Sequence, residues 1–194
     1  HNHYKNMFLK DTERVHVAAI SSLDAEFLID EVSVHRKFKD LNERKLRFIF
    51  VGKLIKDKGV LVLLEAIEIL KRKNVSAQID IMGNGDLETT CREFVQAQNG
   101  SISMSFVETI SYGVDFFKHL ASYDVLLSPN LQDEQSRIIY DAFGQGLMII
   151  GSDAEGLKES CRNEVNALLT ERGNYSALAS AIEFATKNPS KVLE

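Results

Sequence analysis

The sequence predicts an α/β fold, a doubly wound parallel sheet of about six strands with helices on both faces. Six short apolar runs rich in β-forming residues recur along the chain, at residues 46–51, 78–82, 102–106, 124–128, 147–150 and 166–170. A polar turn and then a segment with apolar residues at helical spacing follow each run. This alternation is typical of parallel strands joined by helical crossovers.

The composition is that of an ordinary globular domain. The chain has 194 residues, of which 44% are hydrophobic and 26% charged, which is enough for one core. The formal net charge of -5 argues against a nucleic-acid partner. No apolar run reaches the ~20 residues of a membrane-spanning helix, and we see no signal-peptide pattern. We therefore expect a cytoplasmic protein without a transmembrane segment, and peripheral association with the inner face of the membrane stays open.

A shift in composition near Lys45 separates two parts of the chain. Residues 1–45 are polar and charged, with a candidate strand at 15–20 and an amphipathic piece at 25–34. The first apolar strand run begins directly after them. We therefore predict an N-terminal arm or interdomain segment over 1–45 and a Rossmann-like domain over 46–194.

The first strand run ends at Gly52, and a loop with Lys53 and Lys58 follows it. A helix over about 60–73 comes next, with apolar residues at helical spacing. Loops after parallel strands lie at the carboxyl edge of the sheet, where open α/β folds bind ligands. Two lysines at this edge suit an anion, although solvated surface lysines would give the same pattern.

A helix is predicted after each later run as well. The helix after 124–128 is described below, with the two acids that flank its start. The others are expected at about 86–98, 114–122, 157–162 and 176–187, and Pro189 is expected to stop the last. The second unit contains a glycine turn at 83–85, which either admits a ligand near the backbone or is simply tight. It is not a dinucleotide fingerprint, because Glu88 stands where the third glycine would fall.

The stretch after the fourth run carries two spaced acids. The run ends at Pro129, and a polar loop leads into a helix that begins at about 135–137. Asp133 lies in the loop and Asp141 in the helix, with seven residues between them. The helix N-terminus adds backbone N–H groups and the positive end of a dipole, which suit a phosphate.

This stretch resembles the acidic signature of retaining GT-B glycosyltransferases of family four, the glycosyl transferases group 1. That signature is written E-x7-E-A-x3-G and is followed by a strand and an S/T-D-x-G-G turn. The chain reads Asp133-x7-Asp141-Ala142-x3-Gly146 and then Ser152-Asp153-Ala154-Glu155-Gly156. The family's V-G-R-x4-K-G loop matches Val51-Gly52-Lys53-x4-Lys58-Gly59. Both glutamates, the arginine and one glycine are replaced, while the spacing is kept, and the resemblance spans about 46–187.

The resemblance implies a fold, the C-terminal half of GT-B, and roles for the matching residues. Lys53 and Lys58 would hold the donor diphosphate as it leaves, and Asp133 would accept hydrogen bonds from the transferred sugar. Asp141 would accept hydrogen bonds from the ribose hydroxyls. The other implied donor contacts lie at the two glycine turns, beside the base and at the helix N-terminus: Gly52, Gly83, Val107, Ser136, Arg137 and Ile138.

The resemblance also implies the partners of the domain. These are a nucleotide-sugar donor and a sugar or lipid-linked acceptor, with no cofactor and no metal. The acceptor-binding N-terminal domain of the family has no counterpart in this sequence. We therefore expect the chain to bind the donor without turning it over.

Three other interpretations stay open. The replaced residues favour a non-catalytic scaffold or binding subunit on the same fold. A sugar-nucleotide epimerase would use the same fold for a different reaction. A flavodoxin-like receiver or cofactor module would share the strand pattern, but it leaves the paired lysines and spaced acids unexplained.

Overall fold

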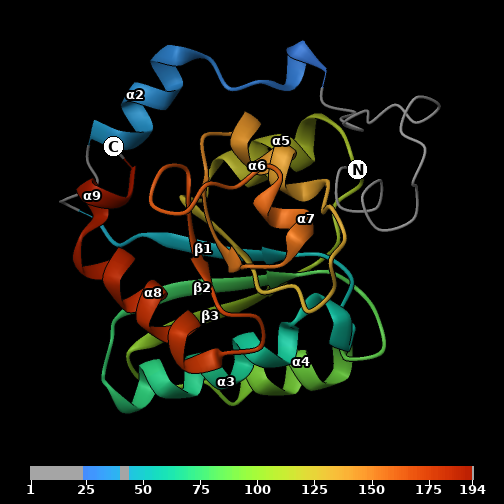
Figure 1. Cartoon of the computed structure of the whole chain (residues 1–194), viewed down its shortest axis with the longest axis vertical. Helices are drawn as coiled ribbons and strands as arrows, with labels where there is room; N and C mark the ends of the chain where they lie inside the picture. Colours follow the sequence, from blue (N-terminus) through green and yellow to red (C-terminus); the bar gives the residue numbers. More distant parts are fainter. Residues whose placement is uncertain (1–23, 40–43, 194) are drawn as a thin grey trace, which may run out of the picture.

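The structure, a computed structural model, describes residues 24–39 and 44–193 (Figure 1). In this part of the chain six strands form one sheet, in the order β3-β2-β1-β4-β5-β6, and every neighbouring pair is parallel. The strands are β1 (Arg47–Val51), β2 (Ala77–Met82), β3 (Ile102–Val107), β4 (Val125–Ser128), β5 (Met148–Ser152) and β6 (Ala167–Thr170). The predicted fold class is confirmed.

Helices cover both faces of the sheet (Figure 1). One face carries α3 (Val60–Arg72), α4 (Glu88–Gln96) and α8 (Tyr175–Lys187), and the other carries α5 (Val114–Ala121), α6 (Ile138–Gly144) and α7 (Glu155–Lys158). Shorter elements are η1 (Ala25–Phe27), α2 (Glu31–Lys39), η2 (Lys56–Lys58) and α9 (Pro189–Leu193). The sheet therefore has one hydrophobic core on each side.

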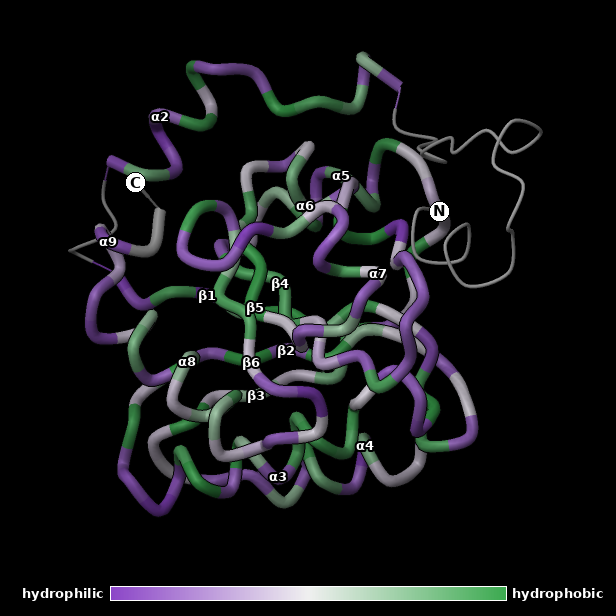
Figure 2. Tube along the Cα trace, in the orientation of Figure 1, coloured by the Kyte–Doolittle hydropathy of each residue, from purple (hydrophilic) through white to green (hydrophobic). Residues whose placement is uncertain are grey.

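The burial of the strands explains their composition. All four residues of β4 and all five of β5 are buried, because helices cover both faces of these strands. In β1 the side chain of Ile49 packs in one core, and those of Phe48 and Phe50 pack in the other. Figure 2 shows this apolar centre of the molecule inside a more polar shell.

The strand order reverses its direction of growth between β1 and β4. From β1 the chain adds β2 and β3 on one side, and then returns to add β4, β5 and β6 on the other. The helices that follow β1 and β4 lie on opposite faces, so the loops after these two strands diverge and leave a crevice. Both lysines and both acids singled out in the sequence follow one of these two strands.

The described part of the N-terminal arm packs against the domain. The ring of Phe27 stacks on that of Phe117, with centroids 4.7 Å apart. The backbone N–H of Ile29 donates to the carbonyl of Gly144 at 2.9 Å, and Lys37 donates to the carbonyl of Gln145 at 3.0 Å. The amphipathic piece at 25–34 thus becomes η1 and the start of α2, and the strand expected at 15–20 lies outside the described residues.

Several helix boundaries differ from the sequence expectation, two of them most clearly. The helix expected at 157–162 is α7, which spans Glu155–Lys158 and so begins and ends earlier, and the Asp133 carboxylate accepts the backbone N–H of its first residue. The last long helix ends at Lys187 as expected, but Pro189 then opens α9. Proline fits the first position of a helix, where its missing N–H is not needed.

Candidate functional site

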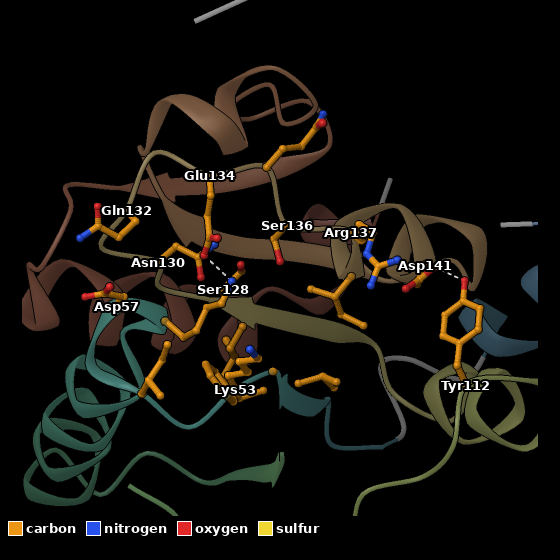
Figure 3. A pocket seen from close by; sticks show the side chains of 18 residues that line it. Lys53, Asp57, Tyr112, Ser128, Asn130, Gln132, Glu134, Ser136, Arg137 and Asp141 are labelled. Carbon is orange, nitrogen blue, oxygen red and sulfur yellow. Dashed lines mark hydrogen bonds and ion pairs between the residues drawn. The ribbon is translucent and has the colours of Figure 1, made fainter. Parts of the chain in front are cut away.

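A pocket of about 540 Å³ lies at the carboxyl edge of the sheet, in the crevice between β1 and β4 (Figure 3). We call it the switch-point pocket. The loops after β1 and β4 form two of its walls, and the backbone N–H of Leu131 joins them by donating to the carbonyl of Asp57 at 2.8 Å. The start of α6 and the loop before α5 complete it. A pocket in this place is where open α/β sheets bind their ligands.

The structure brings most of the predicted site residues together. Seven of them line the switch-point pocket: Gly52, Lys53, Lys58, Ser136, Arg137, Ile138 and Asp141. They come from the β1–α3 loop and from the start of α6, which are distant in sequence. The remaining three, Gly83, Val107 and Asp133, are not among the lining residues.

The cationic side of the pocket is partly neutralised from within. Lys53 is exposed at the end of β1. Lys58 is half-buried at the end of η2, and its ammonium group donates to a carboxylate oxygen of Glu134. Lys58 is therefore already paired with an anion that the sequence comparison had not singled out.

Asp141 is a buried acid with a polar neighbour. Only 7% of its surface is exposed, and its Oδ1 accepts the hydroxyl of Tyr112 at 3.1 Å. Burial raises the pKa of Asp141 above its ordinary value, and the Tyr112 hydrogen bond and the charge of Arg137 partly offset this. In Figure 3 Arg137 and Tyr112 lie on the same side of the pocket as Asp141.

Asp133 is engaged elsewhere. Its Oδ1 accepts the backbone N–H of Glu155 at 2.9 Å and the Arg172 guanidinium at 2.6 Å, and Oδ2 accepts the same guanidinium at 3.3 Å. A Cβ added to Gly156 would lie 2.2 Å from the carbonyl oxygen of Glu134, so only glycine lets this loop sit against α7. The loop thus directs Asp133 towards α7 and Glu134 towards the pocket.

Gly83 and Val107 lie beside the site rather than in it. A Cβ on Gly83 would stand 1.9 Å from the carbonyl oxygen of Gly52, so this turn packs directly under the first loop. Val107 ends β3 and packs against the core that Phe116 and Phe117 share. Neither residue lines the switch-point pocket.

Several residues that line the pocket were not predicted from the sequence or from the family motifs. They include Asp57, Tyr112, Ser128, Asn130, Gln132 and Glu134. Asn130 follows β4 by two residues, so its position at the carboxyl edge alone could have nominated it. Its side-chain amide nitrogen is buried without a hydrogen-bond partner in the described structure, a situation that costs about 1–3 kcal/mol. A ligand acceptor that reached this nitrogen would recover that cost.

Two further searches cover the described residues only. Among them, no group of three or more histidine, cysteine, aspartate or glutamate side chains is placed to hold a metal ion. No helix in the same ranges has the length and apolar character needed to cross a membrane.

Comparison with known sequences gives consistent matches. A family model described as "Glycosyl transferases group 1" matches residues 45–188. The amylovoran biosynthesis glycosyltransferase AmsK of Erwinia amylovora is 25% identical over 162 residues, covering 79% of this chain and 39% of the relative. The capsular polysaccharide biosynthesis glycosyltransferase CapM of Staphylococcus aureus is 20% identical over 161 residues, covering 81% and 41%. The chain thus spans about two fifths of the length of these relatives.

Solved structures share the fold. The C-terminal domain of the glycosyl transferase group 1 family protein LpcC from Francisella tularensis has a TM-score of 0.69 at 13% identity, covering 89% of this chain and 91% of that domain. Anabaena Alr3699/HepE, solved in complex with UDP, has a TM-score of 0.65 at 16% identity, covering 86% and 46%. At these identities the similarity establishes the architecture.

Proposed function

The chain belongs to the glycosyl transferases group 1 family, and on that premise we propose that the switch-point pocket binds the nucleoside diphosphate of a sugar donor. The observation that carries this proposal is the convergence of two lysines from the β1–α3 loop with a buried acid from α6 on one cavity. Cations suit the diphosphate, and a carboxylate suits ribose hydroxyls. The UDP complex of the structural neighbour HepE supports the same ligand class.

The diphosphate is proposed to lie between Lys53 and Lys58. As the donor bond breaks, negative charge grows on the departing diphosphate, and ammonium groups held in place stabilise it. Glu134 already occupies one of the three N–H donors of Lys58, so a bound phosphate would share this ammonium group with Glu134 or displace it. Arg137, exposed at the start of α6, is a further cation for the same phosphates.

The ribose is proposed to lie against Asp141. A hydroxyl that donates to a charged acceptor contributes roughly 1.5–3 kcal/mol, so this contact would be felt in affinity. The proposed contact of Asp133 with the transferred sugar requires a rearrangement, because both of its oxygens accept Arg172 in this structure. A bound donor would therefore compete with Arg172 for Asp133.

The reaction is proposed to be retaining glycosyl transfer. The bond between the anomeric carbon and the diphosphate oxygen breaks, and an acceptor oxygen bonds to the same face of the sugar. The relatives AmsK and CapM are named for amylovoran and capsular polysaccharide biosynthesis, which supports a glycan acceptor. A lipid-linked acceptor, and a location in the cytoplasm or at the inner membrane face, are proposed on the resemblance alone. We propose that the acceptor site and the proton acceptor come from outside the described residues, so that this chain alone binds without turnover.

Calorimetric titration with UDP, GDP and ADP and their common sugar conjugates tests the proposal. We expect one nucleotide class to bind and Lys58→Ala to weaken it at least tenfold, while Lys56→Ala leaves it unchanged. Lys56 is a matched control because it lies in the same η2 turn but does not line the pocket. Absence of binding across the whole panel, in a sample with native circular dichroism, would refute the proposal.

A second candidate function has one specific observation in its favour. Glu134 already neutralises Lys58 and Arg172 already neutralises Asp133, so two of the expected donor-binding groups are satisfied without a ligand. These two ion pairs are what we expect in a binding subunit without catalytic activity, in which Lys58 and Asp133 contact no donor. Absence of nucleotide binding in the titration above, together with a partner protein bound by the folded domain, would favour this second function.

A further inference from the structure

A second pocket, of about 560 Å³, lies at the edge of the sheet opposite the switch-point pocket, where β1 begins. We call it the basic pocket. The end of α5, the middle of α2 and the chain that enters β1 form its walls, and five of its nine lining residues are cationic: Arg36, Lys37, Arg44, Arg47 and Lys118. None of the nine is acidic. The chain as a whole has a formal net charge of -5, so this pocket concentrates positive charge against the average composition.

Four of the five cations have no acidic partner. Arg44 is the exception, since it is paired with Asp124, which has no exposed surface. The other four form no ion pair with any residue that the structure describes. Two of these four, Arg36 and Lys118, are exposed on the outer surfaces of α2 and α5. The basic pocket therefore presents uncompensated positive charge to the solvent.

The two half-buried cations would gain most from an anion. Burial lowers the pKa of Lys37 to about 8, the charge of Asp124 opposes this effect, and the charge of Arg44 adds to it. The guanidinium of Arg47 donates from Nη1 to the carbonyl of Ser122 at 2.9 Å, but its Nε is buried without a hydrogen-bond partner in the described structure. An anion in this pocket would stabilise both side chains in their charged forms.

A mostly apolar hollow of about 600 Å³ adjoins the basic pocket along α2, and Arg36 lines both. Val32, Val34 and Phe38 supply the apolar lining of this α2 hollow. Val32 is 67% exposed and lies one helical turn before Arg36, on the same face of α2. Figure 1 shows α2 on the side of the molecule where β1 begins. Cationic and apolar groups side by side match an amphiphile with an anionic headgroup better than a small polar anion.

We propose that the basic pocket and the α2 hollow form a docking face for a membrane of anionic phospholipids. Phosphate headgroups bind the lysines and arginines, and Val32 contacts the apolar part of the lipid. Each basic residue close to an anionic membrane contributes about fivefold in affinity, so several of them together give stable binding. One free phosphate group at exposed side chains binds weakly in water. Nucleotides that fill the switch-point pocket should therefore leave this face empty.

The docking face lies at the opposite edge of the sheet from the switch-point pocket, so a docked domain keeps that pocket open to the solvent. The inference does not depend on a nucleotide in the switch-point pocket. Since the vesicles that test it contain no nucleotide, the docking face and the proposed function can each fail without the other.

Co-sedimentation with vesicles tests the docking face. We expect the chain to bind phosphatidylcholine vesicles that contain about one-third phosphatidylglycerol, and not vesicles of phosphatidylcholine alone. The double variant Arg36→Gln with Lys118→Gln should bind the anionic vesicles about tenfold more weakly or less. Lys56→Gln with Arg162→Gln is the matched control, because it removes the same charge from two exposed residues that line neither cavity. The inference is overturned if the parent ignores anionic vesicles, or if both double variants lose affinity equally.

Two further arms separate a lipid from a small anion. Val32→Ser keeps every charge and should weaken vesicle binding about twofold to fivefold, while Val165→Ser, at a valine that is 74% exposed elsewhere, should not. Equal affinities of these two variants would contradict the role of the α2 hollow. Inorganic phosphate should release the protein from vesicles no better than sodium chloride of the same ionic strength. Specific release by phosphate would assign the basic pocket to a small anion and overturn the lipid assignment.

Discussion

Two buried acids on either side of β4 show how differently one fold can treat a carboxylate. Asp124 directly precedes the strand, has no exposed surface and accepts three hydrogen bonds: two from the Arg44 guanidinium, both at 2.7 Å, and one from the backbone N–H of Arg47 at 2.8 Å. Asp141 follows the strand, in α6, and accepts one hydrogen bond from the residues that the structure describes, that of Tyr112. Both acids are distant in sequence from the groups that bind them.

The difference separates a structural acid from an acid that is available to a ligand. Asp124 fixes the chain before β1 to the start of β4, and all of its hydrogen bonds lie within the protein. Burial removes most of the water around Asp141, and few protein hydrogen bonds replace that water. This is why the pKa of Asp141 is raised. An acid that is buried, under-bonded and next to a cavity has hydrogen-bonding capacity left for a substrate.

The largest expected effect on folding is that of Asp124→Ala. It leaves the Arg44 guanidinium and the Arg47 N–H without their acceptor, and we expect it to lower the free energy of unfolding by about 3 kcal/mol. This is at the low end for a broken buried pair, because 36% of the Arg44 side chain is exposed. Urea unfolding followed by circular dichroism measures it, with the exposed Asp115→Ala as control. A loss below about 1 kcal/mol would remove the contrast between the two acids.

Asp141→Asn should lower the affinity for the ligand rather than the stability of the fold. Its amide oxygen still accepts the Tyr112 hydroxyl, so the free energy of unfolding should not fall. Loss of the charged acceptor should weaken nucleoside diphosphate binding about tenfold or more. Titration calorimetry beside the Asp115→Asn control checks this. Unchanged affinity in a parent that binds would show that the ribose lies elsewhere.

The pH dependence of stability sharpens the same contrast. The folded-state pKa of Asp141 lies above its ordinary value of 3.8, so folding favours the protonated acid. Its contribution to stability is therefore present below pH 3.8 and is lost as pH rises through the folded-state pKa. An asparagine side chain cannot ionise, so the Asp141→Asn protein should gain stability relative to the parent over that interval. Urea unfolding of both proteins across a pH series checks the sign, and a constant difference would contradict it.

The smallest expected effect is that of Asp133→Asn. The ion pair with Arg172 is partly exposed, at 30% and 37% of the two side chains, so its loss should cost under about 1 kcal/mol. Affinity for the free nucleoside diphosphate should be nearly unchanged. If Asp133 contacts the transferred sugar after releasing Arg172, affinity for the sugar conjugate should fall while affinity for the diphosphate stays, and paired titrations distinguish these outcomes.

The sequence predicts the sheet well because strand signals are local. The apolar runs that became β1 to β6 are contiguous, and their ends agree with the structure within two residues. The same holds for α3, whose apolar residues repeat at helical spacing. Long-range packing was needed only to shift α7 and to start α9 at Pro189.

The site was predictable in part. The spacing of Lys53, Lys58 and Asp141 placed all three at one edge, and the structure brings them into one pocket. Which of the adjacent acids, Asp133 or Glu134, faces that pocket is decided by Arg172, which comes from beyond β6. Nothing near the two acids in the sequence encodes that contact.

Tyr112 shows the same limit. It reaches Asp141 from the loop after β3, and the two residues are brought together only by the packing of α5 beside α6. A lone tyrosine in a predicted loop carries no periodic or spacing signal. Only the folded structure identifies it as a neighbour of the acid.

The most direct test of a donor site at the switch point is an amide NMR titration of this chain with UDP, GDP and ADP. We predict that one nucleotide shifts the amide signals of Gly52 to Gly59 and of the start of α6, while those around Arg47 and Asp124, at the opposite edge of the sheet, stay unchanged. Shifts confined to that opposite edge, or no shifts at saturating concentrations of all three nucleotides, would contradict a nucleotide site between β1 and β4.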